Sequence, residues 1–344
     1  MTTDTYQPRI TPWQIDEYDF YELENFREQM DFLLRYAVLA PSSHNTQPWM
    51  FRATADGVEV FADYSRRLVL ADPDDRELLM SVGAAITNLR VAAAWFGFET
   101  TVMYEHRPEQ TIPVAFVAIR ETCATDEELR RLFPAIRKRH TNRKLFTREP
   151  IASDAVAAVC DVVDRYPETL HLLRHQDRNA IIDLVADGDR RLMERPAIRA
   201  EQADWLRPAE GEQCDGICTD SLGIPGPFAA ANWVLRNMNI GELQAGLDRE
   251  RVGTATALIV VTAEDDRVAL IRAGEVLERL LLTLTHSGLQ YSFLNQPIEV
   301  SELRSRLQDL ALTSVPPQLL LRIGYAKEEA RPTPRRPVQA ILLR

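Results

Sequence analysis

The stretch DRELLMSVGAAITNLRVAAAWFGFE, residues 75–99, is the part of the sequence that decides the fold. Its apolar residues recur at helical spacing, and one face is rich in Ala and Gly. Small side chains let a second backbone approach closely. We therefore expect residues 75–99 to form a long helix at a tight packing interface.

A comparable segment lies in the second half of the chain. The stretch VALIRAGEVLERLLLTLTHSGL predicts another long helix, which ends at Gly288 as the first ends at Gly97. An apolar strand follows each helix, at 112–120 and at 317–326. The order of elements thus recurs with an offset of roughly 190 residues, which favours a duplication. Identity between the halves is poor, so the alternative is a chance similarity between two ordinary α+β segments.

The composition limits the class of protein. The chain has 344 residues, 45% of them hydrophobic, and a formal net charge of −11. This length suits one large or two ordinary domains, and the acidic balance disfavours nucleic acid and membrane surfaces as partners. Its four cysteines have no spacing typical of a disulfide framework or a zinc site, so we expect no metal. Without a secretory signal or an apolar run of membrane-spanning length, we expect a cytoplasmic protein.

A loop dense in polar groups occupies residues 41–49, directly after an expected helix at 22–40. It offers two hydroxyls and two amides, those of Ser42, Ser43, Asn45 and Gln47. Such a set can bracket a planar ligand that has several hydrogen-bonding groups. The alternative is a capping loop, in which these side chains satisfy neighbouring backbone groups.

Two basic segments stand out in this acidic chain. The first is RKRHTNRKLF at 137–146, and the second is RPTPRRPV at 331–338, where prolines restrict Arg335 and Arg336. Arginine offers bidentate geometry to a phosphate, and an ordered arginine suits a fixed anion. Both segments are therefore candidate anion sites. The alternatives are a solvated connector for the first and an ordinary basic tail for the second.

Three motifs together resemble the FMN-dependent nitroreductase family. APSSHNTQPW at 40–49 resembles the family's APS-x-x-N-x-QPW loop, and KRHTNRKLFTREPI at 138–151 resembles its basic opening segment. LLLRIGYAKEEARPTPRRPV at 319–338 resembles its closing strand and the arginine that follows. Each motif alone is modestly specific, but the three together span most of the chain.

The order of the motifs resembles that of a twin nitroreductase, similar to the mycobacterial Acg group, in which one chain forms a pseudo-dimer. An ordinary member has the basic opening before the loop, and two identical chains share each FMN. The resemblance implies an α+β fold duplicated in one chain, each half a mainly antiparallel sheet flanked by helices, with the long helices packed between the halves. The expected halves are 1–125 and 126–344, with a lid-like insert near 204–233.

The same resemblance implies one FMN site built from both halves. The matching positions are Pro41, Ser42, Ser43 and Asn45 in the loop, Arg139, His140, Thr141 and Arg143 in the basic opening, Asn295 and Gln296 after the second long helix, and Arg335 and Arg336 at the end. Arg139, Thr141 and Arg143 match the opening positions that grip the phosphate and the ribityl chain, and Arg336, alone or with Arg335, matches the closing phosphate contact. His140 would act mainly through its backbone, and Gln47 would orient the loop. No side chain is expected to be catalytic, because FMN performs the hydride chemistry.

Two functions of different class remain open. The first is an oxidoreductase in which NADH or NADPH reduces FMN, which then reduces a nitroaromatic, a quinone or a similar small molecule by ping-pong hydride transfer. The second is a storage or sequestering protein, in which the insert near 204–233 covers the flavin and turnover is low. A third reading is a flavin-free interaction protein. The internal pseudo-dimer predicts a monomer or a weak homodimer.

Overall fold

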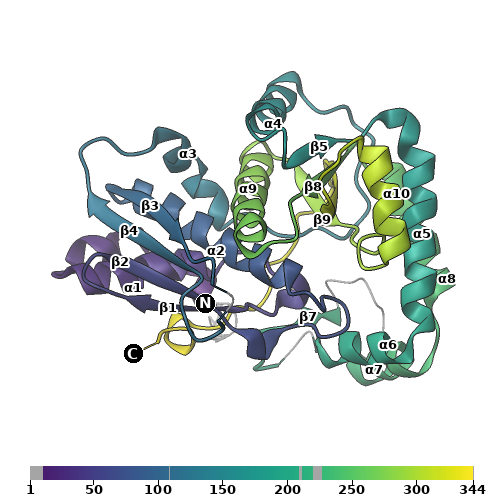
Figure 1. The fold of residues 1–344 in the computed structure, drawn as a ribbon, viewed down its shortest axis with the longest axis horizontal. Helices are drawn as coiled ribbons and strands as arrows, with labels where there is room; N and C mark the ends of the chain where they lie inside the picture. Colours follow the sequence, from purple (N-terminus) through teal and green to yellow (C-terminus); the bar gives the residue numbers. More distant parts are fainter. Residues whose placement is uncertain (1–10, 108, 209–210, 220–226, 344) are drawn as a thin grey trace, which may run out of the picture.

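The computed structural model describes residues 11–107, 109–208, 211–219 and 227–343 of the chain (Figure 1). Two four-stranded antiparallel sheets lie on either side of a central pair of long helices, α2 (Arg76–Trp95) and α9 (Arg267–His286). The predicted α+β class, the two antiparallel sheets and the two long helices between them are confirmed.

The two sheets have equivalent strand orders. The first is β1-β2-β4-β3, formed by β1 (Trp49–Ala53), β2 (Gly57–Ala62), β4 (Ala115–Glu121) and β3 (Phe98–Tyr104). The second is β5-β8-β10-β9, formed by β5 (Leu170–Leu172), β8 (Ala257–Thr262), β10 (Pro317–Gly324) and β9 (Gln290–Phe293). In each sheet the fourth strand in sequence lies third in space, which is the pattern that a duplication produces. Strand β3 was not predicted from the sequence; exposed and partly buried residues alternate along it, and only Phe98 is buried.

The remaining helices cover the sheets and extend the second half. They are α1 (Phe26–Ala37), α3 (Glu127–Ile136), α4 (Ser153–Arg165), α5 (Arg178–Glu194), α6 (Pro196–Asp204), α7 (Phe228–Asn237), α8 (Gly241–Thr254) and α10 (Ser301–Ala311). The expected irregular insert contains a short parallel ribbon of β6 (Leu206–Arg207) and β7 (Ile217–Cys218), and it ends inside α7. The three alanines at 229–231 favour helix once the chain has passed Pro227.

The backbones of α2 and α9 touch where they cross. A Cβ on Gly83 would collide with the carbonyl oxygen of Ile271, and a Cβ on Gly274 would collide with that of Met80. An offset of 191 residues relates Gly83 to Gly274 and also Met80 to Ile271, so the crossing is pseudo-symmetric. The prediction that small residues serve close approach is confirmed.

Helix α2 is also long and apolar enough, by length and composition alone, to cross a membrane. Sequence analysis expected no run of that length. Most of α2 is buried against α1, α3 and α9, so the packed core accounts for its composition.

The end of the chain returns to the first half. The amide of Phe51 in β1 donates to the carbonyl of Ile341 (2.9 Å), and the amide of Leu343 donates to the carbonyl of Phe51 (2.7 Å). This pairing carries the segment 333–338 past the polar loop. Residues from both ends of the chain therefore meet beside the helix crossing.

Candidate functional site

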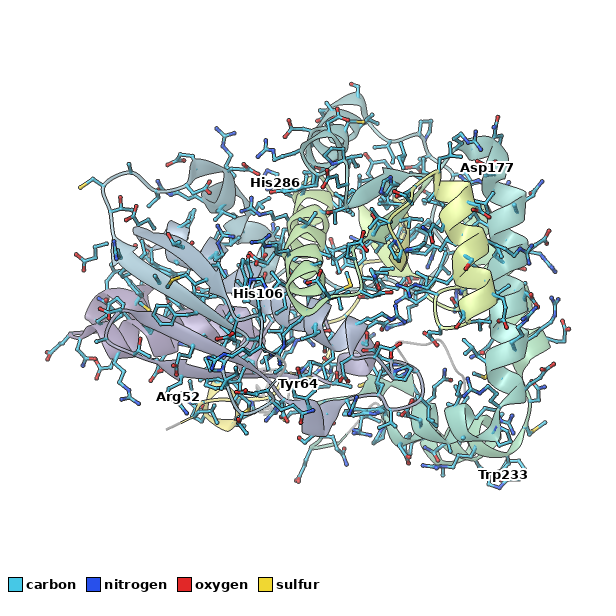
Figure 2. The ribbon with its side chains drawn as sticks, in the orientation of Figure 1. Arg52, Tyr64, His106, Asp177, Trp233 and His286 are labelled. Atoms are coloured by element: carbon cyan, nitrogen blue, oxygen red, sulfur yellow. The ribbon has the colours of Figure 1, made fainter. Side chains whose placement is uncertain are left out.

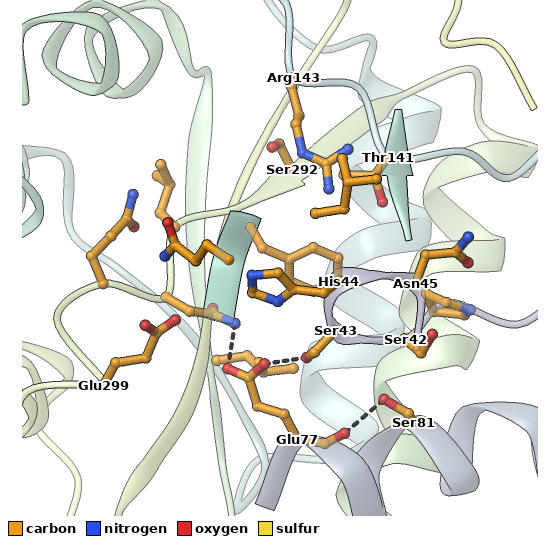
Figure 3. Close-up of a pocket in the computed structure, with 18 of the residues that line it drawn as sticks. Ser42, Ser43, His44, Asn45, Glu77, Ser81, Thr141, Arg143, Ser292 and Glu299 are labelled. Carbon is orange, nitrogen blue, oxygen red and sulfur yellow. Dashed lines mark hydrogen bonds between the residues drawn. The ribbon is translucent and has the colours of Figure 1, made fainter. Parts of the chain in front are cut away.

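A cavity of about 300 Å³ lies between the two halves, next to the α2–α9 crossing (Figure 3). Its wall includes eleven of the twelve predicted site residues: Pro41, Ser42, Ser43, Asn45, Arg139, His140, Thr141, Arg143, Asn295, Gln296 and Arg335. Segments that are more than 290 residues apart in sequence thus share one cavity. Arg336 is the exception, since it is absent from the wall.

The polar loop is held in a strained conformation. Its residues His44, Asn45 and Gln47 have φ values of 50°, 55° and 53°, in the left-handed region that side chains other than Gly rarely adopt. Asn tolerates this region better than most residues. Backbone strain persists only where surrounding contacts fix it, and it concentrates at functional sites.

Contacts from both halves hold the loop in place. The Asn45 amide donates to the carbonyls of Gly216 (3.0 Å) and Pro334 (2.9 Å), and its oxygen accepts from Arg335 (2.8 Å). The fully buried Gln47 donates to the Cys214 carbonyl at 2.8 Å and accepts from the backbone amide at 336 at 2.8 Å. Gln47 therefore orients the loop without lining the cavity, as its position in the motif predicted.

Two predicted arginines direct their donors into the protein. Arg139 donates to the Tyr291 hydroxyl (2.5 Å) and the Leu39 carbonyl (2.9 Å), and its Nε lies 3.2 Å from Glu278. Burial lowers the pKa of Arg139, but Tyr291 and Glu278 outweigh burial and the pKa is raised. Arg335 donates to Asn45 and to the carbonyls of residues 39 and 40. Both side chains fix the start of the loop from the cavity wall.

Arg143 is different, because its guanidinium has no hydrogen bond or ion pair among the described residues. Burial, and then the neighbouring Arg251, lower its pKa to about 10. Figure 3 shows Arg143 at one end of the cavity, with Thr141 and Ser292 close by. The cavity therefore contains an uncompensated cation with hydroxyl groups beside it.

The side chain of Arg336 points away from the cavity, on the opposite side of its segment from Arg335. Its guanidinium donates to the carbonyls of Gln47 (3.2 Å) and Ala340 (2.9 Å) and lies 3.8 Å from Asp63. Successive side chains of an extended segment point in opposite directions, and Pro337 holds Arg336 in an extended conformation. Only one of two adjacent arginines can therefore face the cavity, and that one is Arg335. A phosphate contact through Arg336 does not fit this geometry.

Sequence reasoning missed an acidic side of the cavity. Glu77, at the start of α2, accepts hydrogen bonds from the Ser43 hydroxyl and from the Asn295 amide (2.9 Å) (Figure 3). Burial, and then repulsion from Asp72, raise the pKa of Glu77 to about 7. The predicted Gln296 donates to Asp189 (3.1 Å) in the same wall. An acidic residue in the first turn of a helix is common, so nothing in the sequence marked Glu77.

Two histidines line the cavity in neutral form. His140 packs edge-on against Trp13, with ring centroids 4.6 Å apart, and burial followed by Arg139 and Arg335 lowers its pKa to about 3. Burial and then Arg143 lower the pKa of His44 to about 4. The positive charge of the cavity at neutral pH is therefore carried by arginine.

The insert contributes Gly216 and Ile217 to the cavity wall. Asp215 forms ion pairs with Arg66 and with Arg207 (2.9 Å), which fix the ribbon beside the polar loop. The exposed Trp233 lies on the outer surface, away from the cavity (Figure 2). Among the described residues of the insert, Gly216 and Ile217 border the site.

Comparison with known proteins finds relatives that match almost end to end. No family model matches the chain. It is 29% identical over 327 residues to "Putative NAD(P)H nitroreductase Rv3131" of Mycobacterium tuberculosis, covering 92% of this chain and 91% of that protein. It is 29% identical over 325 residues to "Putative NAD(P)H nitroreductase acg" of the same organism, covering 90% and 93%. Among solved structures, a nitroreductase with bound FMN from Bacteroides fragilis covers 58% of this chain and 90% of its own, at 15% identity and a TM-score of 0.33.

Proposed function

Since the chain belongs to the nitroreductase-like family, we propose that it is an FMN-binding oxidoreductase that uses NAD(P)H. The observation that carries the proposal is the uncompensated guanidinium of Arg143, in a cavity that joins the polar loop of one half to the basic opening of the other. Bound FMN would supply hydride transfer from NAD(P)H to a small acceptor such as a nitroaromatic or a quinone.

The residues present fit FMN. A phosphate monoester is a natural partner for a half-buried arginine that lacks a counter-ion, and Thr141 and Ser292 offer hydroxyl donors beside it. Met80, Ala84 and Leu277 give the wall an apolar part that suits a planar ring. Arg143 would therefore hold the phosphate, in place of the predicted Arg336. Arg139 and Arg335 would act by positioning the loop.

The chain's own contribution is binding, orientation and exclusion of water. Strained loop residues fixed by Asn45 and Gln47 present the Ser42 and Ser43 hydroxyls to the cavity without further rearrangement. Gly216 and Ile217 of the insert cover one side of the cavity and limit the access of solvent. We further propose that the protein is cytoplasmic. It would be a monomer or a weak homodimer, because the interface that pairs two subunits in ordinary family members would lie inside this chain.

A second function, flavin storage with little turnover, is favoured by the contacts of the insert. The bonds from Asn45 to Gly216 and from Gln47 to Cys214, with the ion pair from Arg66 to Asp215, tie the insert to the polar loop. If these contacts persist in solution, the insert would act as a lid that keeps NAD(P)H and acceptors from the flavin.

An anaerobic reduction experiment tests both functions. The purified protein, saturated with FMN, is mixed with NADPH or NADH, and the flavin absorbance is followed before and after addition of a nitroaromatic or a quinone. The oxidoreductase predicts bleaching within seconds and recovery when the acceptor is added. Bound flavin that is not bleached over many minutes supports storage instead. Protein that takes up no FMN would refute both.

A further inference from the structure

The contacts proposed above for FMN do not use the acidic side of the cavity. Four carboxyl groups line it, those of Glu77 in α2, Asp189 in α5, Asp248 in α8 and Glu299 after β9. Figure 3 shows Glu77 and Glu299 on one side of the cavity and Arg143 on the opposite side. This charge separation means that the cavity offers a second, anionic end to a ligand.

Several oxygen atoms at this end lack a hydrogen-bond donor. Asp189 is only 2% exposed, and its Oδ2 has no partner within the described chain, although Oδ1 accepts from Gln296. The side-chain oxygen of Gln296 is buried and equally unsatisfied there. The Glu299 side chain forms neither a hydrogen bond nor an ion pair with any described residue. Buried polar atoms are normally paired, so a cluster of free acceptors indicates a missing donor.

Among the described residues, no lysine or arginine forms an ion pair with Glu77, Asp189 or Glu299. Arg76, whose charge acts on both Glu299 and Glu77, donates from Nη1 to Gln318 at 3.1 Å, and its buried Nε has no partner among the described residues. Arg251 is paired with Asp248 at 2.7 Å, and Gln296 already donates to both Asp248 and Asp189. Among the described residues there is no group of three or more acidic, His or Cys side chains arranged to hold a metal ion. An organic cation therefore fits better than a metal.

The raised pKa values of Glu299 and Asp189 agree with a site that lacks its cation. Burial is the main cause that raises the pKa of Glu299 to about 8, with Glu77, Asp72 and Asp189 adding to it and Arg76 opposing it. For Asp189, burial and then Asp248 raise the pKa to about 8, while Gln296, Arg251 and Arg190 oppose the rise. Crowded carboxyls without a counter-ion hold their protons. A cation that entered would favour their ionised form.

We propose that this end of the cavity is a subsite for a protonated amine carried on an apolar or aromatic body. Once the carboxyls are ionised by an entering cation, the free groups are all acceptors, which match the N–H donors of a primary ammonium and not a quaternary one. Met80, Leu192 and Met193 line the same cavity and suit an apolar body. The evidence for the subsite is this arrangement of carboxyl groups, unsatisfied oxygens and apolar side chains, and it does not depend on the proposed function. That the amine is the electron acceptor of the reaction rests on the proposed function.

Calorimetric titration of the purified full-length protein tests the subsite without requiring turnover. Three ligands of similar shape are compared: 4-nitrobenzylamine, 4-nitrobenzyl alcohol and 4-nitrobenzoate. The amine should bind at least about tenfold more tightly than the alcohol near pH 8, and the benzoate most weakly. The preference for the amine should fall as the pH is lowered towards 6, because the carboxyls then hold their protons.

Two variants locate the effect. Glu299→Gln and Asp189→Asn should each reduce amine affinity to near that of the alcohol, while leaving alcohol affinity unchanged. Glu250→Gln removes an exposed carboxylate from α8 and should leave the preference intact. Glu299 has no side-chain partner to lose, so its variant should fold even if Asp189→Asn does not, and thermal melts check this.

The outcomes separate this inference from the proposed function. Equal affinity for amine and alcohol in the wild type, or a preference that survives both variants, would overturn the subsite. If FMN is bound and reduced but no amine preference exists, the proposed function stands and the subsite fails. If no flavin is taken up but the amine preference is present and is lost in Glu299→Gln, the subsite stands and the proposed function fails.

Discussion

Replacing Gly274 by Ala tests the geometry on which the whole site depends. Gly274 lies in α9 where it crosses α2, and an added Cβ would lie 2.7 Å from both the Cα and the carbonyl carbon of Met80. These are backbone atoms, so no side-chain rotation can relieve the contact. An ordinary carbon contact begins near 3.4 Å, so the two helices would have to separate by roughly 1 Å.

Two opposing effects set the size of the change. Exchanging Gly for Ala inside a helix contributes about 0.5–1 kcal/mol of stability through lower backbone entropy in the unfolded chain. Overpacking a dense interior typically costs about 1–3 kcal/mol, and a gap of up to 1 Å forfeits a quarter to a half of each dispersion contact along the crossing. We expect the second effect to win, with a net destabilisation of about 1–3 kcal/mol.

Urea unfolding followed by circular dichroism measures this change, and α8 offers a matched control. A Cβ on Gly246 would meet nothing within 4 Å, so Gly246→Ala has the helix benefit without the clash and should be neutral or stabilising by up to about 1 kcal/mol. The two variants should therefore move in opposite directions. If Gly274→Ala is as stable as Gly246→Ala, the two backbones are not in contact and the pairing of the halves is wrong.

The site yields three further predictions. Arg143→Ala should weaken FMN retention by about 1.5–3 kcal/mol, measured by flavin fluorescence during dialysis, while Arg336→Ala should leave it nearly unchanged; the reverse order would refute the phosphate assignment. Burial, and then Glu77, raise the pKa of Glu299 to about 8, above roughly 4.3 in the unfolded chain. Between these two pH values the folded state holds a proton that the unfolded state releases. The wild type should therefore lose stability relative to Glu299→Gln as the pH rises. A difference in melting temperature between the two proteins that is the same at pH 5 and at pH 8 would contradict this. Asn45→Ala removes three buried hydrogen bonds and should cost about 1–3 kcal/mol in urea unfolding, whereas unchanged stability would mean that the insert is not tied to the loop.

Sequence patterns over short distances predicted the helices whose position depends mainly on neighbouring residues. Helical periodicity identified α2 and α9, and both end where a Gly takes a positive φ, 88° at Gly97 and 75° at Gly288. Strand β3 was missed because exposed residues alternate with partly buried ones along it, so its sequence lacks a long apolar run. Most of the residues of the candidate site were found because they belong to three short motifs, and such motifs can be recognised from neighbouring residues in the sequence.

Two kinds of feature could not be predicted from short sequence patterns: those set by strand register, and those formed by residues far apart in the sequence. Whether Arg335 or Arg336 faces the cavity depends on how the end of the chain pairs with Phe51, and a shift by one residue would exchange the two. Glu77 and Glu299 are 222 residues apart, and each occupies an ordinary position in its own segment. Only the packed fold brings such carboxyls together.

The offset of 191 residues also allows equivalent positions in the two halves to be compared. The comparison explains why the cavity described above has no equally open counterpart at the equivalent positions. On α2, Ser81 and Ala84 line the cavity. The pseudo-equivalent positions on α9 are Arg272 and Glu275, which are larger and charged. Arg272 lies 4.7 Å from the ring centroid of Tyr104, and Glu275 accepts a hydrogen bond from the Tyr104 hydroxyl (2.5 Å). The space that mirrors the cavity is therefore occupied by a side-chain network.

Such divergence requires a single chain. In a symmetric homodimer each residue appears on both sides of the interface, so a substitution that closes one site closes both. Duplication within one polypeptide removes this constraint, because position 81 can stay small while position 272 becomes an arginine. The closing network can then stabilise the contact between the halves, since Glu275 also pairs with Arg90 of α2 at 2.9 Å. At these positions a side-chain network with an ion pair joins α2 to α9, while the cavity on the other side of the crossing can carry unlike charges at its two ends.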